Sequence, residues 1–358
     1  MDDYLHPVKD VRDHRNNFDL IRLIAALQVL LLHHLAFFQF LDNDSAKLLE
    51  RFIWNFPGVN VFFIISGYLI FQSLERNSLK LFIEKRFKRI YPALIICFFL
   101  TILLLVYFNS LSFKEVLTFD FGKWIVAQLT IFQFYNPEIV RDFGFSPPNG
   151  ALWTISVELQ FYLFVAILWY FLLKKIDKWK RNTILIICFI ISALYNYLFN
   201  KYLHPDSLAY KLSFVFVLSY LYFFIAGALV YLNRTFFIKI FKGKALLWIF
   251  IFISFGFVLD HFQIMYYRYV FNGLSFIMLV LLVAVVFSIA NTRPSLSGKI
   301  LKGNDISYGI YIYQMPIINL FFHLHLNTKP YQFALSLGLC VIFGFFSWFA
   351  IEKKVLKR

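Results

Sequence analysis

The sequence predicts an all-α, polytopic membrane protein: a transmembrane helical bundle of about ten spans. Hydrophobic residues make up 60% of the 358 residues and charged residues only 15%, and the mean hydropathy is +0.69. A soluble domain would carry about 25% charged residues. Because a backbone inside a bilayer must satisfy its hydrogen bonds within each segment, the apolar segments should be helices.

Each predicted span is an apolar segment close to the length that crosses a bilayer, about 20 residues. The ten segments cover residues 19–40, 58–74, 90–109, 153–173, 183–199, 212–232, 245–259, 269–290, 306–323 and 331–351. The segments between them are too short for a soluble second domain. Residues 1–358 are therefore expected to form a single membrane-embedded domain.

The net charge of +15 has a simple explanation in the loops. Segments on one side of the predicted membrane hold 25 Lys and Arg residues, and segments on the other side hold 9. Basic residues collect on the cytoplasmic side, so both termini are predicted to be cytoplasmic and the lipid bilayer, not nucleic acid, is the expected partner. The N-terminus lacks the pattern of a cleaved signal peptide. Cys97, Cys188 and Cys340 lie in apolar runs without metal or redox spacing, so no metal site is expected.

The longest segment on the predicted outer side, residues 110–152, is more than a turn. It contains a semi-apolar stretch around Trp124 and ends in Ser-Pro-Pro-Asn-Gly at 146–150. The sequence leaves two possibilities open, a re-entrant or interfacial helix and an ordered loop that caps the bundle.

Ionisable residues inside predicted spans are the first candidates for a functional site, with a structural ion pair or a packing histidine as the simpler alternative. The first span carries Asp19, Arg22 and His33, and the fourth carries Glu158. His33 follows Arg22 by eleven residues, about 20° from the same helix face, and Asp19 lies one turn before Arg22. His34 points about 100° away and is interpreted as a packing residue.

Helix rise places His33 and Glu158 at similar depths, each within about 10 Å of the outer edge of the bilayer core. The two side chains are therefore expected to meet. A carboxylate beside an imidazole fixes its tautomer and raises its basicity, as a general base requires. Arg22 lies deeper, toward the cytoplasm, where an anionic group from the cytosol would reach it.

Other polar features are weaker alone. Residues 58–67, Gly-Val-Asn-Val-Phe-Phe-Ile-Ile-Ser-Gly, place small and polar residues inside the second span, which favours close helix packing. The run from Lys80 to Pro92 is basic, and it is either a membrane anchor or a phosphate clamp. Pro316 is expected to kink the ninth span just after Gln314.

Five motifs, in order along nearly the whole chain, resemble those of the acyltransferase-3 family of bacterial integral-membrane acyltransferases. They are Phe18-Asp19 with Arg22-x10-His33, the segment 58–67, Lys85-Arg86-Phe-Lys-Arg89-Ile-Tyr-Pro92, Trp153-Thr-Ile-Ser156-Val-Glu158-Leu-Gln-Phe-Tyr162, and Ser307-Tyr308 through Gln314-Met-Pro316. Two positions depart from the family pattern: Asn60 replaces its usual Asp, and Gln314 stands where His is common.

The resemblance implies transfer of an acyl group, most often acetyl, from cytoplasmic acetyl-CoA to a hydroxyl of an extracytoplasmic carbohydrate, in the bacterial cytoplasmic (inner) membrane. Acetyl-CoA is expected as a co-substrate, with no bound cofactor. O-antigen, capsule or exopolysaccharide, peptidoglycan, a lipid-linked sugar or other glycolipid intermediate, and a secreted small molecule all stay open as acceptors.

The resemblance and the positions within the spans together suggest roles. We expect His33 to be the general base, Glu158 to orient it and Arg22 to polarise the donor thioester. The phosphates of CoA would be held by Lys85, Arg86 and Arg89, and the expected supporting residues are Asp19, Asn60, Ser66, Trp153, Ser156, Tyr308 and Gln314. Direct transfer and a covalent acyl-enzyme both stay open, with His33 as the leading carrier in the second case.

Two other classes of function compete with the acyltransferase. A proton-coupled transporter or a lipid or glycolipid flippase would use the same buried charges as a proton relay. The absence of an internal repeat argues against it. A non-enzymatic assembly or sensor subunit is the third possibility.

Overall fold

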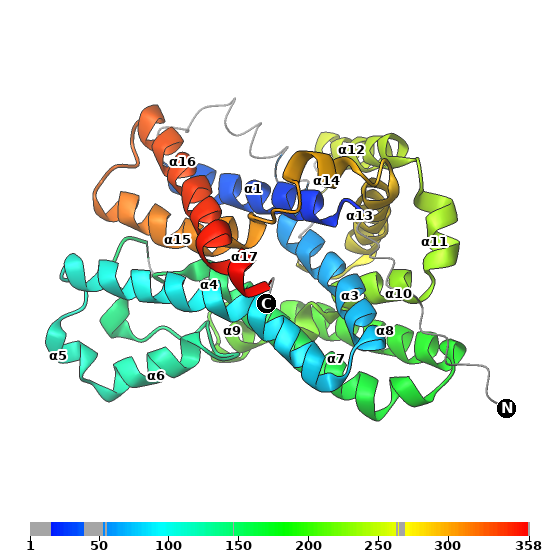
Figure 1. The fold of residues 1–358 in the computed structure, drawn as a ribbon, viewed down its shortest axis with the longest axis horizontal. Helices are drawn as coiled ribbons and strands as arrows, with labels where there is room; N and C mark the ends of the chain where they lie inside the picture. Colours follow the sequence, from blue (N-terminus) through cyan, green and yellow to red (C-terminus); the bar gives the residue numbers. More distant parts are fainter. Residues whose placement is uncertain are drawn as a thin grey trace.

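We describe the protein from a computed structural model, which defines residues 16–38, 53, 56–145, 147–262, 264 and 269–356. Within these ranges the chain is helical and has no strand (Figure 1). The longer helices are α1 (Phe18–Phe37), α3 (Gly58–Arg76), α4 (Leu79–Tyr107), α7 (Trp153–Phe171), α8 (Lys178–Tyr202), α10 (Leu221–Leu232), α12 (Ala245–His261), α13 (Gly273–Asn291), α15 (Ser307–His323) and α16 (Pro330–Phe346). Shorter helices connect them: α5 (Phe113–Val116), α6 (Phe119–Gln128), α9 (Leu208–Phe214), α11 (Arg234–Phe241), α14 (Leu296–Leu301) and α17 (Lys353–Leu356).

Each of the ten predicted spans overlaps one of the longer helices, but the predicted number of spans is not confirmed. Among the described residues, seven helices are long and apolar enough to cross a bilayer, or eight if α10 and α11, bent by 94° at Asn233, form one broken span. The three other predicted segments fall short for local reasons. The 212–232 segment is split between α9 and α10, while α12 and α15 have only 17 residues each.

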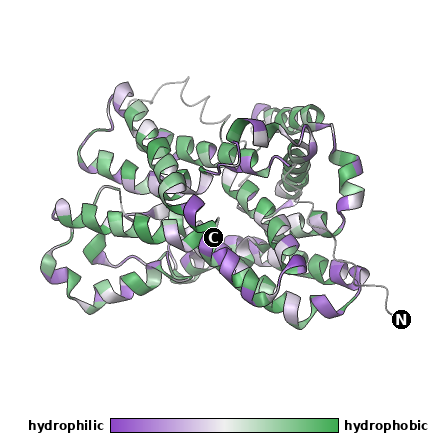
Figure 2. Cartoon of the chain, viewed as in Figure 1, coloured by the Kyte–Doolittle hydropathy of each residue, from purple (hydrophilic) through white to green (hydrophobic). Residues whose placement is uncertain are grey.

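Apolar side chains face outward along much of the bundle, as a bilayer allows. Examples are Phe99, Leu163 and Ile190, each more than half exposed. Hydrophilic residues gather at the first turns of α4 and at α17, close to the C-terminus (Figure 2). The outer surface of the bundle is therefore largely apolar, and a polar region lies where α4 meets the end of the chain.

Close packing of α3 against α10 depends on two glycines. A Cβ atom at Gly67 would lie 1.9 Å from the carbonyl oxygen of Phe224, and one at Gly227 would lie 1.9 Å from that of Ile64. Neither distance leaves room for a methyl group, so both helix backbones are in direct contact. The expectation of small-residue packing in the second span is confirmed at Gly67.

The long segment 110–152 contains α6 and an ordered cap. Trp124 of α6 is buried, and its indole nitrogen donates to Asn136 Oδ1 at 3.1 Å. The last part of the segment is held by α15: Asn319 Nδ2 donates to the carbonyls of Pro147 and Pro148, and the Phe145 amide donates to Asn319 Oδ1.

Pro316, the residue expected to kink the ninth span, lies inside helix α15. Proline has no amide hydrogen, so the carbonyl four residues earlier, that of Ile312, loses its usual helical donor. Asn149 Nδ2 donates to this oxygen at 2.9 Å, and Cys97 Sγ lies 3.3 Å from it. Neighbouring side chains thus satisfy the carbonyl, as bilayer-embedded helices with proline require.

Candidate active site

A cavity of about 1150 Å³ lies among α1, α3, α4, α7 and α15. Its wall begins at exposed residues in the first turns of α4, such as Leu81 and Glu84, and extends to Thr154 and Glu158 on α7. Six basic side chains line it: Arg22, Arg76, Lys85, Arg86, Lys88 and Arg89. Four acidic side chains also line it, Asp19, Glu84, Glu158 and Asp305, so basic groups exceed acidic ones by two. The cavity is reachable from the side that the sequence predicts to be cytoplasmic.

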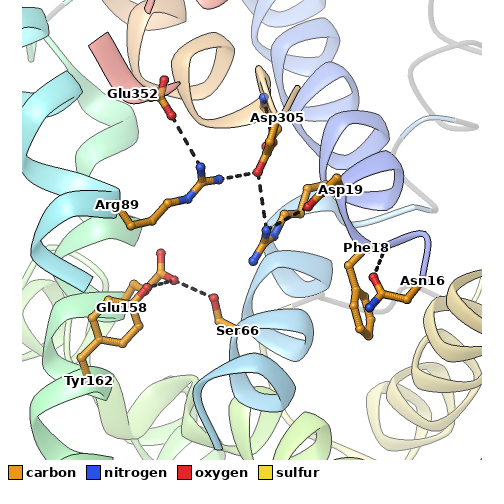
Figure 3. A network of polar contacts seen from close by, with 11 residues as sticks. Asn16, Phe18, Asp19, Ser66, Arg89, Glu158, Tyr162, Asp305 and Glu352 are labelled. Atoms are coloured by element: carbon orange, nitrogen blue, oxygen red, sulfur yellow. Dashed lines mark hydrogen bonds and ion pairs between the residues drawn. The ribbon is translucent and has the colours of Figure 1, made fainter. Parts of the chain in front are cut away.

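Arg89 is held inside the cavity wall by two buried carboxylates (Figure 3). Its Nη2 atom lies 2.5 Å from Asp305 Oδ2, and its Nη1 atom lies 3.6 Å from Glu352 Oε2. Arg22 Nη1 lies 3.5 Å from the same Asp305 oxygen and 3.4 Å from Asp19 Oδ1. The charge of Arg89 is thus balanced within the protein, so its first role is to join α4, the start of α15 and the C-terminal helix.

The ionisation of Asp305, which precedes α15, follows from this network. Burial acts to raise the pKa of Asp305, but the nearby Arg89 and Arg22 guanidinium groups and hydrogen bonds from Ser307 outweigh burial. The pKa is consequently lower than the ordinary value of a carboxyl group. Asp305 is negatively charged at neutral pH and holds both arginines.

Deeper in the cavity, one carboxylate oxygen of Glu158 accepts hydrogen bonds from two hydroxyl groups. Ser66 Oγ on α3 donates to Glu158 Oε1 at 2.6 Å, and the Tyr162 hydroxyl donates to the same oxygen at 2.5 Å (Figure 3). Tyr162 stands one helical turn after Glu158, and the Arg86 guanidinium lies 5.8 Å from its ring centroid. All four residues line the cavity, so a bound molecule would meet a hydroxyl group, a carboxylate and a cation together.

Outside the cavity lining, Gln314 determines which nitrogen of His33 carries the proton. Gln314 Nε2 donates to the carbonyl oxygen of Tyr311 at 2.9 Å, so the amide oxygen Oε1 faces His33. This oxygen only accepts, so His33 Nδ1, 3.1 Å away, is the donor. In the neutral ring, Nε2 is then the unprotonated nitrogen that can take a proton.

His34 is a structural residue, as its orientation on the first span indicates. It is fully buried, its Nδ1 atom lies 2.8 Å from the carbonyl oxygen of Leu30, and its Nε2 atom lies 2.9 Å from Ser336 Oγ. Both ring nitrogens are occupied, and the contact with Ser336 fixes α1 against α16.

The structure corrects the predicted pairing of His33 with Glu158. Gln314 contacts the His33 ring, while Ser66 and Tyr162 contact Glu158. Similar depth in two helices does not place them on neighbouring sides of the bundle, and this is why the prediction failed.

The predicted site residues divide into two groups. Eight line the cavity: Asp19, Arg22, Ser66, Lys85, Arg86, Arg89, Glu158 and Tyr308. Five lie elsewhere: His33, Asn60, Trp153, Ser156 and Gln314. Of these, Asn60 is buried on α3, Trp153 packs against Phe214 and Tyr220, and the Ser156 hydroxyl donates to the carbonyl of Ile131.

Sequence reasoning missed Asp305 and Glu352. Their side chains are almost inaccessible, although both lie at the margins of predicted spans, where carboxylates usually face water. Glu352 lies in a π-helical turn, Ser347–Glu352, and accepts a hydrogen bond from Ser347 Oγ at 2.8 Å. A π-helical turn often marks a functional position, but hydropathy gives no signal for it.

These features define a class: a helical membrane protein with a charged cavity that ends at a hydroxyl–carboxylate pair. In the part of the chain that the structure describes, no three His, Cys, Asp or Glu side chains converge as metal ligands. The polar groups that line the cavity are side-chain hydroxyls, amides, carboxylates, and the cationic groups of lysine and arginine.

Comparison with known proteins gives the family. The profile described as "Acyltransferase domain", that of the acyltransferase-3 family, matches residues 15–351. The chain belongs to this family and is an acyltransferase. No solved structure matches it.

Three relatives illustrate the family. Nodulation protein 10 of Rhizobium leguminosarum bv. viciae is 29% identical, over 96% of this chain and 94% of its own length. The O-acetyl transferase of Shigella phage Sf6 is 25% identical, over 96% of this chain and 97% of its own. Peptidoglycan O-acetyltransferase OatA of Listeria monocytogenes is 27% identical, over 86% of this chain but 53% of its own length.

Proposed function

We propose that the protein is an O-acetyltransferase of the bacterial inner membrane. It takes an acetyl group from cytoplasmic acetyl-CoA and transfers it to a hydroxyl of an extracytoplasmic polysaccharide or glycolipid. The relatives named as O-acetyltransferases support the acetyl group and the oxygen acceptor. Residues 1–358 would act as one membrane-embedded domain.

The observation that carries this proposal is the basic cavity that ends at Ser66 and Glu158. Its volume, about 1150 Å³, exceeds the ~300–1,000 Å³ of ordinary ligand pockets, as a long nucleotide thioester requires. Lys85 and Arg86, already proposed to bind the phosphates of CoA, line it together with Arg76 and Lys88. Arg89 would contribute indirectly, because Asp305 and Glu352 hold its guanidinium group. Arg22 would face the thioester end of the donor.

His33 is the proposed general base for the acceptor. Its Nε2 atom would take the proton of the acceptor hydroxyl as the oxygen attacks the acyl carbonyl carbon. Gln314, in place of Glu158, would hold the imidazole in this tautomer through the contact with Nδ1. The base and the donor cavity are thus assigned to different parts of the bundle.

Transfer of radiolabel tests this function. Inside-out membrane vesicles that contain the protein and a verified surface polysaccharide would receive acetyl-CoA labelled in the acetyl group. We expect base-labile label in the carbohydrate fraction with wild-type protein and none with His33→Ala. A carbohydrate fraction that stays unlabelled with wild-type protein, while the protein moves an unmodified glycolipid across the membrane, would contradict the proposal and favour a flippase.

A further inference from the structure

Ser66 has the surroundings of an activated nucleophile. We propose that Ser66 accepts the acyl group from the donor thioester, with Glu158 as its base, to form an acyl-enzyme before the acceptor reacts. This proposal rests on the proposed function and adds a covalent intermediate to it.

The geometry is that of a nucleophile, a base and a group that orients the base. Ser66 Oγ donates to Glu158 Oε1 at 2.6 Å, within the range expected for a hydroxyl and its base. Tyr162 donates to the same oxygen from one turn further along α7 and holds the carboxylate in place. These three residues all line the cavity assigned to the donor.

The backbone that carries Ser66 is closely packed. The next residue, Gly67, lies so close to the backbone of Phe224 that an added Cβ would lie 1.9 Å from its carbonyl oxygen. Helix α3 is therefore held directly against the backbone of α10 beside Ser66. A nucleophile fixed in this way meets a bound thioester without loss of orientation.

The separate positions of Ser66 and His33 explain why a covalent intermediate would be useful. Ser66 lines the cavity, whereas His33 does not, and His33 lies about 16 Å further along α1 than Arg22. Transfer to Ser66 would release the bulky CoA and leave only a small acyl group between the two regions. The acceptor hydroxyl then reacts with the acyl ester on Ser66, and CoA no longer needs to be bound at the same time.

The step is balanced as follows. Ser66 Oγ attacks the thioester carbonyl carbon and its proton passes to Glu158, so that a C–O bond forms as the C–S bond breaks. The CoA sulfur leaves as a thiolate, which takes a proton from the water that reaches the cavity from the cytosol. In the second half, the acceptor hydroxyl gives its proton to His33 Nε2, its oxygen replaces Ser66 Oγ at the acyl carbon, and Glu158 returns its proton to Ser66 Oγ. The imidazolium then releases its proton to water on the acceptor side.

Labelling of the protein itself tests the proposal. Full-length protein in nanodiscs, without acceptor, would be incubated with radiolabelled acetyl-CoA, and protein-bound label would be located by peptide mapping. We expect label on Ser66 in the wild type and a loss of at least about 100-fold in Ser66→Ala. Ser288→Ala is the matched control. It removes a buried serine hydroxyl of α13 that lies outside the cavity and donates to the carbonyl of Val285, and it should be labelled as the wild type is.

Two further variants make the test specific. Ser66→Cys should carry a thioester, which neutral hydroxylamine cleaves, where the wild type carries an oxygen ester that resists it. When acceptor is then added, the wild type should lose its label and His33→Gln should keep it, because the second half of the reaction is blocked.

Failure of the Ser66 intermediate and failure of the proposed function would give different results. Label that persists in Ser66→Ala, or that is missing from wild type and His33→Gln while vesicles with wild-type protein still acetylate carbohydrate, overturns the Ser66 intermediate and leaves the proposed function standing. Vesicles in which wild-type protein acetylates nothing, together with unlabelled protein, overturn both.

Discussion

The cavity around Arg89 and Glu158 differs from the region around His33 in the charge of the groups that hold its functional side chains. The cavity is large and is lined by six basic side chains, and its central arginine is balanced by two buried carboxylates. At His33 the partner is a neutral amide, and helix α15, which provides it, also holds the ordered cap of residues 110–152. The difference suggests that donor binding depends on charge, whereas acceptor activation depends on one fixed tautomer.

Loss of the base should give the largest effect on turnover. With His33→Gln, we expect acetylation of the acceptor to fall by about 10² to 10⁴-fold, the usual contribution of a general base. His261→Gln, an exposed histidine at the end of α12, is the control and should keep wild-type turnover. The measurement is the initial rate in vesicles. Equal rates for both variants would remove His33 from the mechanism.

Arg89→Ala should produce the largest loss of stability. The change leaves Glu352 buried without its cation and leaves Asp305 with Arg22 alone, and a broken buried pair typically costs about 3–5 kcal/mol. Lys123→Ala breaks the exposed pair with Asp120 and should leave the unfolding temperature nearly unchanged, because solvent screens such a pair. Thermal unfolding in detergent compares the two, and similar shifts would show that the Arg89 network is not buried as described.

Gly67→Ala tests the packing beneath Ser66. The added methyl group would force α3 away from Phe224, and overpacking of this kind typically costs about 1–3 kcal/mol. Gly122→Ala in α6 has no atom within 4 Å of the new Cβ and should be neutral or slightly stabilising. Unfolding temperatures measure both, and a neutral Gly67→Ala would contradict the close contact of α3 and α10.

The role of Gln314 should appear as a smaller kinetic effect. Gln314→Leu removes one hydrogen bond to His33, worth about 1.4 kcal/mol, so turnover should fall about tenfold. Gln314→Glu keeps an acceptor for Nδ1–H and should retain more activity. In both, the rate should still decline at low pH as the imidazole becomes protonated. A variant whose rate is independent of pH would show that His33 is not the base.

The ion pairs of Asp305 predict an effect that is constant with pH. Because the pKa of Asp305 is lowered on folding, its stabilising contribution is complete above the ordinary carboxyl pKa of 3.8 and is lost only as the pH falls through the lower folded value. In a Glu352→Gln background, which removes the other carboxylate beside Arg89, the stability difference between Asp305 and Asp305→Asn should therefore be the same at pH 8 and pH 5. A difference that shrinks within this range would mean that Asp305 is not held as an anion.

The sequence predicted the positions of helices and motifs better than it predicted which side chains contact one another between helices. Hydropathy and bilayer physics placed a helix at every predicted span, and motif resemblance selected eight residues that do line the cavity. Helical periodicity gives depth and facing but not the order of helices around the bundle, so the His33–Glu158 pairing was wrong. Hydropathy also cannot distinguish a solvated carboxylate from Asp305 or Glu352, because both lie near helix ends and become buried only when α4, α15 and the C-terminal helix meet.

The measurement that tests the separation of the two regions most directly is a single-turnover assay of CoA thiol release with His33→Gln. The protein would be mixed with acetyl-CoA and acceptor, and both free thiol and acetylated acceptor would be followed. We expect about one thiol released per protein molecule and no acetylated acceptor, because the donor cavity is intact and only the second half of the reaction is blocked. Absence of thiol release would contradict two separate half-reactions and indicate direct transfer in a single step that requires His33.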